Sequence, residues 1–286
     1  MFHDIDPKKL DNHYTDLTPA ANDYVFVFRG TGRKDDLVLM KKTADNVISF
    51  PTAGELWAAN PGCEWTLRYF FSIDDERFFY LEYDEPAVLP EGYTWEILRS
   101  VRYTKPRYLS FAATVGYHLF NWYRDSRFCG RCGGPTVHDK KERAKFCPAC
   151  KRLIFPRIQP AVIIGLRHGD TICTSKYAGP RGSGNRALLA GFCEIGETAE
   201  ETVAREVMEE VGLKVTNVTY YKSQPWGFES DLLLGYWAEV DGDIDITLDK
   251  EELESAEFVK RSELEEMGNL NSLTATMIEA FRKGEA

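Results

Sequence analysis

The chain has 286 residues, of which 43% are hydrophobic and 28% charged, and its formal net charge is −10. This composition is typical of a folded globular protein and excludes a disordered one, and the length allows two domains with a substantial core. The acidic balance excludes non-specific nucleic-acid binding as the default function.

The sequence also gives expectations about location. The first residues are polar and charged, and no apolar run reaches the length of a membrane span, so neither a signal peptide nor a membrane partner is expected. Four of the seven cysteines stand in CxxC pairs, which indicates metal ligation in a reducing compartment. We therefore expect a cytoplasmic protein.

The first part of the chain, residues 1–125, contains no catalytic motif. Its aromatic and apolar runs predict several strands and two helices. The expected strands are Tyr24–Phe28, Thr66–Phe71 and Arg77–Tyr83, and the expected helices are Ala53–Ala59 and Tyr108–Ser126. We expect a mixed α/β domain that serves as a scaffold or as a dimer contact.

Two CxxC pairs follow, in a segment expected to span residues 126–154. They are Cys129 with Cys132 and Cys147 with Cys150, with fourteen residues between the pairs. Two such pairs can place four thiolates around one tetrahedral Zn²⁺, which leaves no open position for catalysis, so a structural zinc is predicted. A ribbon that touches nucleic acid is the alternative, because the stretch HDKKERAK between the pairs is basic and could hold phosphate.

Residues 155–286 are expected to form the second large domain. Strand-like and helix-like runs alternate in it, which predicts a mixed sheet between helices. The expected strands are Pro160–Leu166, Thr171–Lys176, Arg186–Phe192, Val215–Tyr221 and Leu232–Val240, with a flexible loop over Gly179–Asn185 and a closing helix over Asn271–Lys283. The cysteines outside the CxxC pairs are expected to be buried thiols: Cys63, Cys173 and Cys193.

An acidic helix stands at the centre of this domain. Thr198 and Glu201 have the spacing of a capping box, so the helix is predicted to begin at Ala199, and Gly212 predicts its end. An apolar stripe runs along one face of this helix, because valines recur every four residues. These valines are Val203, Val207 and Val211.

Three glutamates lie on the adjoining face of the helix: Glu206, Glu209 and Glu210. Like charges this close destabilise a helix in water. A divalent cation would turn the repulsion into coordination, since Mg²⁺ takes oxygen ligands and keeps phosphate as a further ligand. A solvated acidic helix is the alternative, but Gly191 and Gly196 before the helix indicate that backbone approaches a ligand closely.

The order of residues here resembles the signature of the Nudix hydrolases. Gly191 is followed after five residues by Glu197 and after seven more by Arg205–Leu213, REVMEEVGL. With the preceding four-cysteine ribbon and the later Ser223–Phe228, SQPWGF, the chain resembles the NADH pyrophosphatase branch of that family.

That branch usually has SQPWPFPxS at the later motif. In this chain Gly227, Glu229 and Asp231 replace the two later prolines and the final serine. Because proline restricts its φ angle, a less rigid turn is expected here.

The resemblance implies a fold and an activity. The fold is α/β (α+β), a Nudix α/β/α sandwich with a mixed sheet that follows a zinc ribbon and an N-terminal mixed α/β domain. The activity is Mg²⁺- or Mn²⁺-dependent hydrolysis of the pyrophosphate bond of NAD(H) to nicotinamide mononucleotide and AMP, with the 5′ end of NAD-capped RNA as a further substrate.

Two alternatives to this activity stay open. One is a Nudix hydrolase of other nucleoside diphosphate derivatives, such as ADP-ribose. The other is a nucleic-acid-binding module with a vestigial Nudix fold. The family also implies a homodimer, in which the SQPW loop reaches toward the partner subunit.

The resemblance further assigns roles to residues. Catalysis falls on Glu206, Glu209 and Glu210, while Glu197 and Arg205 fix the geometry of loop and helix. The implied ligands of the catalytic metal are Glu206, Glu210, the backbone carbonyl of Ala190 and a later glutamate, for which Glu252 is favoured over Glu251. The rings of Phe155 and Phe192 are expected to sandwich a base, and the other expected substrate contacts are Gln224, Pro225, Trp226, Gly227, Phe228, Arg102, Glu142 and Thr274.

Overall fold

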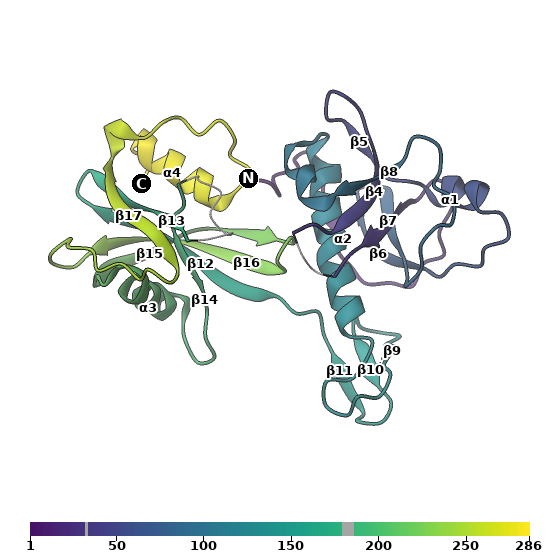
Figure 1. Ribbon diagram of the computed structural model, residues 1–286. Coiled ribbons are helices and arrows are strands. Elements are labelled where there is room, and N and C mark those ends of the chain that lie inside the picture. Colours follow the sequence, from purple (N-terminus) through teal and green to yellow (C-terminus); the bar gives the residue numbers. More distant parts are fainter. Residues whose placement is uncertain (32–33, 179–185) are drawn as a thin grey trace. The chain divides into compact units, whose positions relative to one another are not determined.

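The structure is a computed structural model that describes residues 1–31, 34–178 and 186–286, so the loop expected over 179–185 lies outside the described residues. The chain divides into two compact units. The C-terminal unit consists of Met1–Phe2, Ile158–Trp226 and Asp231–Ala286, and the N-terminal unit of His3–Arg157 and Gly227–Ser230. Figure 1 labels the elements of both. No helix in the described ranges is long and apolar enough to cross a bilayer.

The N-terminal unit contains two small sheets and the helix α2 (Arg107–Asp125). The first sheet has the order β1-β6-β7-β2, formed by Leu10–Asp11, Leu67–Ile73, Glu76–Leu81 and Tyr24–Phe26. The second has the order β3-β4-β5, with β8 also paired to β4, formed by Phe28–Arg29, Leu37–Lys42, Ile48–Ser49 and Thr94–Ile97. The remaining elements before α2 are α1 (Ala53–Ala59) and the 3₁₀ helix η1 (Leu98–Tyr103).

The single strand expected over 24–28 is wrong, because this run is divided between the two sheets. β2 pairs in parallel with β7 and places Val25 opposite Phe79. β3 pairs antiparallel with β4 and places Phe28 opposite Val38. Val27, between them, is fully buried. The chain thus passes from one sheet to the other inside the core, which explains why the whole run is apolar.

Helix α2 covers an aromatic core in this unit. The ring of Phe120 lies 5.1 Å from that of Phe28 and 5.6 Å from that of Tyr80. A Cβ on Gly116 would lie 2.6 Å from the ring of Phe26, so the glycine lets the helix approach the sheets closely. The expected helix over 108–126 is therefore confirmed to within one residue at each end.

A three-stranded ribbon follows α2. Its strands have the order β11-β10-β9 and comprise Arg152–Ile154, Lys145–Cys147 and Val137–His138. The contacts that divide the chain into units group this ribbon with the N-terminal unit.

The C-terminal unit is built on a six-stranded sheet of order β15-β16-β12-β13-β17, with β14 also paired to β12. In chain order its strands are β12 (Gln159–His168), β13 (Thr171–Tyr177), β14 (Leu189–Phe192), β15 (Val215–Trp226), β16 (Asp231–Val240) and β17 (Leu253–Lys260). β12 is parallel to β16 and antiparallel to β13 and β14. The expected mixed sheet is confirmed.

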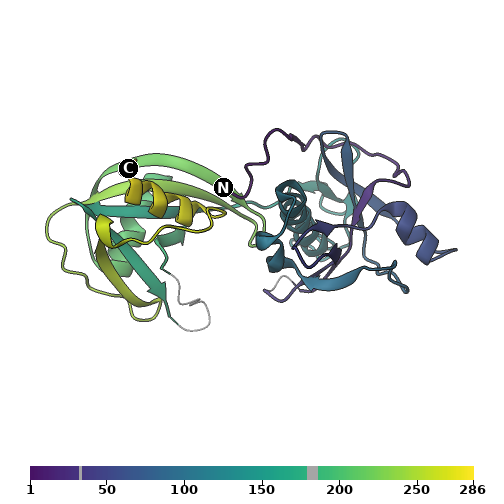
Figure 2. The ribbon, with the colours of Figure 1, turned by 90° about the horizontal axis from the view of Figure 1, so that it is seen from above.

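One helix covers each face of this sheet. Along β12, Val162 and Ile164 join the core beneath α3 (Ala199–Val211), together with Val207 of that helix. Ile163, which points to the other face, joins the core beneath α4 (Leu273–Lys283). Figures 1 and 2 agree that α3 and α4 lie on opposite sides of the sheet. The expected α/β/α sandwich is therefore confirmed.

Some local expectations need correction. The strand expected over 215–221 continues to Trp226, so the SQPW residues are strand rather than loop. The strand expected from Arg186 begins at Leu189. Cys173 is buried as expected, but Cys193 is half-buried and Cys63 is exposed. Cys63 follows the turn after α1.

Candidate active site

Helix α3 begins and ends as its local chemistry predicts. The amide of Glu201 donates to Thr198 Oγ1 at 3.2 Å, and the amide of Thr198 donates to Glu201 Oε2 at 2.7 Å. At the other end Gly212 adopts a left-handed conformation with φ +72°, which is the usual way to close a helix. Because both ends are fixed locally, the glutamates of α3 hold a defined position against β14.

Arg205 holds the preceding loop to the helix. Its Nε and Nη2 donate to the two oxygens of Glu197 at 2.6 and 2.9 Å. Its Nη2 also donates to the carbonyl oxygen of Phe192 at 2.9 Å, and its Nη1 donates to Glu206 at 2.7 Å and to Glu209 at 2.8 Å. One guanidinium therefore links β14, the loop and two of the helical glutamates.

Both carboxylate oxygens of Glu197 accept hydrogen bonds, so this residue has a structural role. Beyond Arg205, it accepts hydrogen bonds from the amide of Glu194 at 3.0 Å and from the hydroxyl of Thr202 at 3.0 Å. The bond with Arg205 lowers the pKa of Glu197 to about 2, and the same contact raises the pKa of Arg205. Thr202 was missed at the level of sequence, although it is fully buried. A threonine four residues after a helix cap gives no indication in the sequence that its hydroxyl donates a hydrogen bond to a glutamate.

Glu206 lies against the backbone of Gly191. A Cβ at residue 191 would be 1.9 Å from the carboxyl carbon of Glu206, so any larger residue would push this carboxylate away. Glu206 is also buried, and the loss of solvation raises its pKa even though Arg205 counteracts the shift. The glycine that opens the Nudix signature therefore makes room for its first helical glutamate.

Among the three glutamates Glu206, Glu209 and Glu210, only Glu210 has a buried carboxylate oxygen without a hydrogen-bond partner among the described residues. It is 2% exposed, and its Oε2 has no hydrogen-bond partner in the part of the chain that the structure describes. Burial first, and then the charges of Glu206 and Glu252, raise its pKa to about 8, while the backbone amide of Ala190 favours the ionised form. A buried carboxylate without a cation is costly, so the surroundings of Glu210 favour a positive charge beside it, which a metal ion would supply.

The residues present fit a divalent cation. Glu206 and Glu210 both have buried carboxylates of raised pKa, Ala190 lies beside them, and hard cations prefer such oxygen ligands. The carboxylates of the acidic residues lie farther apart than the sulfurs of the zinc site. Among the described residues, the four cysteines are the one group of three or more His, Cys, Asp or Glu whose ligand atoms all lie within 4.8 Å of one another. Phosphate and water oxygens would complete so open a site.

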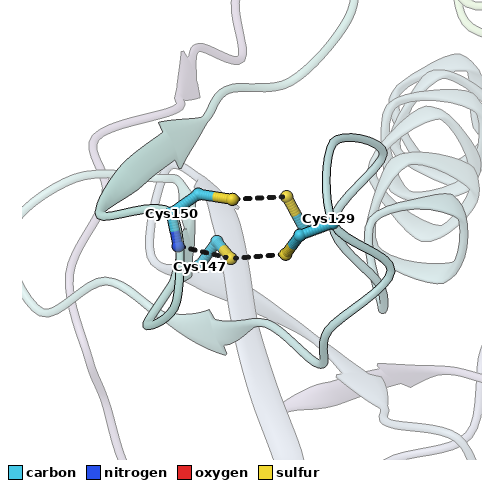
Figure 3. A group of neighbouring side chains, drawn as sticks. Cys129, Cys147 and Cys150 are labelled. Atoms are coloured by element: carbon cyan, nitrogen blue, oxygen red, sulfur yellow. Dashed lines mark hydrogen bonds between the residues drawn. The ribbon is translucent and has the colours of Figure 1, made fainter.

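The four cysteines of the ribbon form a compact metal site. Figure 3 labels three of these cysteines. The sulfurs of Cys129 and Cys150 are 4.0 Å apart, and those of Cys132 and Cys147 are 3.6 Å apart. Tetrahedral Zn²⁺ with Zn–S bonds of about 2.3 Å separates its sulfurs by about 3.8 Å. The expected structural zinc site is therefore confirmed in its ligands and spacing.

Backbone groups support these cysteines. The amide of Cys150 donates to the sulfur of Cys147 at 3.3 Å. Gly133, with φ +71°, donates its amide to the carbonyl oxygen of Cys129 at 2.8 Å. Hydrogen bonds from backbone amides lower the pKa of Cys129 to about 6, so a thiolate, the form that binds zinc, is favoured there.

The two aromatic residues expected to sandwich a base lie in different units and are described separately. Phe192, at the end of β14, is 52% exposed, and its carbonyl is held by Arg205. Phe155, just after β11, is 55% exposed. Each ring therefore offers a free face, unlike the core phenylalanines of the chain.

The SQPW residues have unequal surroundings. Gln224 is fully buried, its Nε2 donates to the carbonyl oxygen of Asn271 at 3.0 Å, and its Oε1 accepts from the amide of Leu273 at 2.7 Å. The amide thereby fastens the start of α4 and has no free face for substrate. Pro225 is exposed and Trp226 half-buried.

The next residues, Gly227 and Phe228, pack within the N-terminal unit. A Cβ on Gly227 would lie 2.2 Å from the carbonyl oxygen of Thr114. Phe228 is 7% exposed and lies under the guanidinium of Arg99, which also pairs with Glu229. Contacts made by Gly227, Phe228 and Glu229 thus hold the turn in which a less rigid backbone was expected. The rigidity of this turn stays a prediction.

The remaining expected contacts are scattered. Arg102 is half-buried in η1, 5.9 Å from the ring of Tyr103, and Glu142 is exposed in the loop between β9 and β10. Thr274 is half-buried in the first turn of α4. The acids of α3 lie in the C-terminal unit, together with Ala190, Gly191 and Phe192. Thr274 belongs to the same unit, whereas Arg102 and Glu142 belong to the N-terminal unit.

Comparison with known families agrees with this geometry. Residues 158–281 match the NUDIX domain, so this part of the chain is a Nudix domain. Residues 124–155 match the NADH pyrophosphatase zinc ribbon domain, so the chain combines this ribbon with a Nudix domain.

Curated relatives match about half of the chain. The chain is 42% identical over 149 residues to the NAD-capped RNA hydrolase NudC of Klebsiella pneumoniae (strain 342) and to that of Salmonella schwarzengrund (strain CVM19633), with 52% of this chain and 57% of each relative covered. The chain thus spans a little over half the length of the curated relatives it matches. Among solved structures, a NUDIX hydrolase from Nitrosomonas europaea aligns with 55% of this chain and 90% of its own, at 19% identity and a TM-score of 0.45.

Proposed function

We propose that the chain hydrolyses the pyrophosphate bond of NAD(H) to nicotinamide mononucleotide and AMP, and that it removes NAD caps from RNA by the same reaction. The observation that carries the proposal is the buried carboxylate of Glu210, whose Oε2 has no partner among the described residues, next to Glu206 at the end of β14. The relatives named NAD-capped RNA hydrolase and the matched NADH pyrophosphatase ribbon support the substrate class.

The roles of the acidic residues follow from their surroundings. Glu206 and Glu210 would hold Mg²⁺ or Mn²⁺, with the backbone of Ala190 and, across the site, Glu252, whose charge acts on both of them. Bound divalent cations neutralise phosphate charge and lower the pKa of a coordinated water. Glu209 stands at the exposed edge of this set, where it shares Arg205 with Glu206.

Arg205 and Glu197 would position other groups of the site and would not themselves react. Their ion pair fixes the carbonyl of Phe192 and the carboxylate of Glu206 in the same network. Such order lowers the cost of arranging the site during the reaction.

The nucleotide would be recognised by flat side chains. Phe192 and Phe155 expose about half of their surface, and a ring face can stack on a base. Trp226 and Pro225 would border the substrate, while Gln224 would act indirectly by holding α4 and Thr274. Arg102, Glu142, Gly227 and Phe228 complete the proposed set of contacts.

Three broader features belong to the same proposal. The protein would act as a homodimer in the cytoplasm, and residues 1–125, 126–154 and 155–286 would form its scaffold, ribbon and catalytic domains. Zinc in the ribbon would be structural, because four sulfurs fill its coordination.

The proposal is tested by product analysis. The purified chain is incubated with NADH and Mg²⁺ or Mn²⁺, and the products are separated by chromatography. Formation of the mononucleotide and AMP supports the proposal. The variant Glu210→Gln should lose nearly all turnover, while Glu265→Gln, which changes an exposed glutamate after β17, should keep it. Turnover of ADP-ribose or nucleoside triphosphates with none of NADH would contradict the proposed substrate.

A further inference from the structure

The zinc ribbon carries a charge opposite to that of the rest of the chain. Residues 127–157 contain nine Lys and Arg against two Asp and Glu, a formal charge of +7, in a chain of net charge −10. A zinc centre with four thiolates would carry −2, which still leaves the segment positive. Because charges are screened over about 8 to 10 Å in physiological salt, a ligand at the ribbon meets this local charge and not the acidic total.

One face of the ribbon sheet is used to attach it to its own unit. His138 and Lys145 are directly opposite in β9 and β10. His138 Nε2 lies 2.6 Å from Glu82 Oε1, and Lys145 is 3% exposed. Glu82 also pairs with Arg68 at 3.0 Å. This face is therefore closed to other partners.

The opposite face of the sheet is apolar and open. Val137, Phe146 and Leu153 form the neighbouring row across the three strands, and adjacent rows point to opposite faces of a sheet. Val137 is 50% exposed and Leu153 36%. Phe128, which pairs with Pro135 just before β9, is 59% exposed.

Exposed basic side chains occur along the ribbon, mostly in its loops. Seven Lys and Arg of the ribbon are exposed, and one of them, Arg127, lies over the ring of Tyr83. In the described ranges none of the other six forms a salt bridge, since the ion pairs nearby involve Arg124 and His138. The six are Arg131, Lys140, Lys141, Lys151, Arg152 and Arg157. Arg152 stands opposite Cys147, in a row that belongs to the closed face. We therefore call the other five, which lie outside the strands, together with Phe128, Val137 and Leu153 the outer ribbon face.

We propose that the outer ribbon face binds single-stranded RNA, namely the RNA body that follows the cap of a capped substrate. Exposed cations can contact successive phosphates, and exposed aromatic or apolar side chains can stack on bases that are not paired. An acidic peptide would satisfy the cations and leave the ring of Phe128 unused. The inference rests on the proposed function in one respect, that the substrate carries a polynucleotide.

Binding is measured apart from hydrolysis, so that the two proposals can fail independently. A 12-nucleotide single-stranded RNA with a 3′ fluorophore and no cap is titrated with the full chain carrying Glu210→Gln, without added Mg²⁺ or Mn²⁺, and anisotropy is followed at several salt concentrations. RNA binding together with absent NADH turnover in the unmutated chain would overturn the proposed function and leave this inference standing.

A charge-reversed variant locates the surface. Lys140→Glu, Lys141→Glu and Lys151→Glu together should weaken RNA binding on the order of 100-fold in 50 mM salt and reduce the slope of log K against log salt by about 2, as expected for three lost phosphate contacts. The matched control reverses three exposed lysines elsewhere, Lys42, Lys214 and Lys260, and should change affinity little. Zinc content is measured in both. Equal affinity of the two triple variants would overturn the proposal.

The aromatic part has its own test. Phe128→Ala should weaken RNA binding by about 5- to 150-fold, the range found for loss of one stacked base. Polyglutamate should displace the labelled RNA much less well than unlabelled RNA of equal charge. Unchanged affinity in Phe128→Ala, together with equal displacement by polyglutamate, would show that the face responds to charge alone and would contradict the proposed partner.

Discussion

The carboxyl group of Glu206 occupies the space that a side chain at residue 191 would need. A Cβ built on Gly191 would lie 1.9 Å from the carboxyl carbon and 2.0 Å from one carboxylate oxygen of Glu206. The first residue of the Nudix signature and its first helical glutamate, fifteen positions apart, are thus one steric unit. Neither residue can be understood without the other.

Gly191→Ala should therefore damage activity more than stability. The colliding atoms are the end of a flexible side chain, so Glu206 can swing away without unfolding α3. A shift of about 1 Å in a catalytic group can cost about 100-fold in rate, and NADH turnover should fall by at least that factor. Melting temperature should change little. The control is Gly268→Ala, because a Cβ at residue 268 meets nothing within 4 Å. Full activity of Gly191→Ala would show that Glu206 need not stay where it is.

Glu210 should make the stability of the protein without added Mg²⁺ or Mn²⁺ depend on pH. Its pKa is raised from 4.5 to about 8 in the folded chain. Between these values the folded state holds a proton that the unfolded state has lost, so the contribution of Glu210 to the free energy of unfolding falls as pH rises through this range. Below it, the contribution is fully present.

The variant Glu210→Gln cannot ionise and should lack this dependence. Its melting temperature should match that of the unmutated chain near pH 4 and exceed it near pH 9, with no divalent cation added. Mg²⁺ or Mn²⁺ should raise the melting temperature of the unmutated chain at pH 9 and leave that of the variant unchanged. Parallel curves for the two proteins across the whole range would remove Glu210 from this role.

Loss of one zinc ligand should release the metal and weaken the N-terminal unit. Cys147 is fully buried and 3.6 Å from Cys132. Cys147→Ser should lower bound zinc to well below one ion per chain, measured by elemental analysis, and lower the free energy of unfolding by more than about 3 kcal/mol. Cys63→Ser changes an exposed cysteine and should keep the full zinc content. Retention of zinc by Cys147→Ser would exclude a four-cysteine site.

Gly227 should tolerate no side chain. Its added Cβ would lie 2.2 Å from the carbonyl oxygen of Thr114, a backbone atom inside α2 that cannot move aside cheaply. Gly227→Ala should cost about 1 to 3 kcal/mol of stability, seen as a lower denaturation midpoint. Gly268→Ala again serves as the control, and equal midpoints for the two variants would show that the turn does not pack on α2.

The part of the site that depends on local chemistry could be predicted from sequence. Thr198, Glu201 and Gly212 specify the ends of α3 through bonds to their own helix, so the helix and its acidic face followed directly. The spacing of Cys129, Cys132, Cys147 and Cys150 likewise predicted a cluster that the structure confirms.

Features that depend on distant pairing could not be predicted in the same way. The run at 24–28 is uniformly apolar, and nothing within it indicates that Val25 faces Phe79 while Phe28 faces Val38 in another sheet. Gln224 lies in a motif associated with substrate, yet its amide is used by Asn271 and Leu273, almost fifty residues later. Such partners become visible only once the chain is folded.

Anomalous diffraction from crystals soaked in Mn²⁺ with a non-hydrolysable dinucleotide would show whether Glu206 and Glu210 hold divalent cations against a diphosphate. We expect manganese peaks within about 2.2 Å of carboxylate oxygens of Glu206 and Glu210, with a diphosphate oxygen as a further ligand. Dinucleotide bound with no manganese at these two glutamates would contradict this expectation.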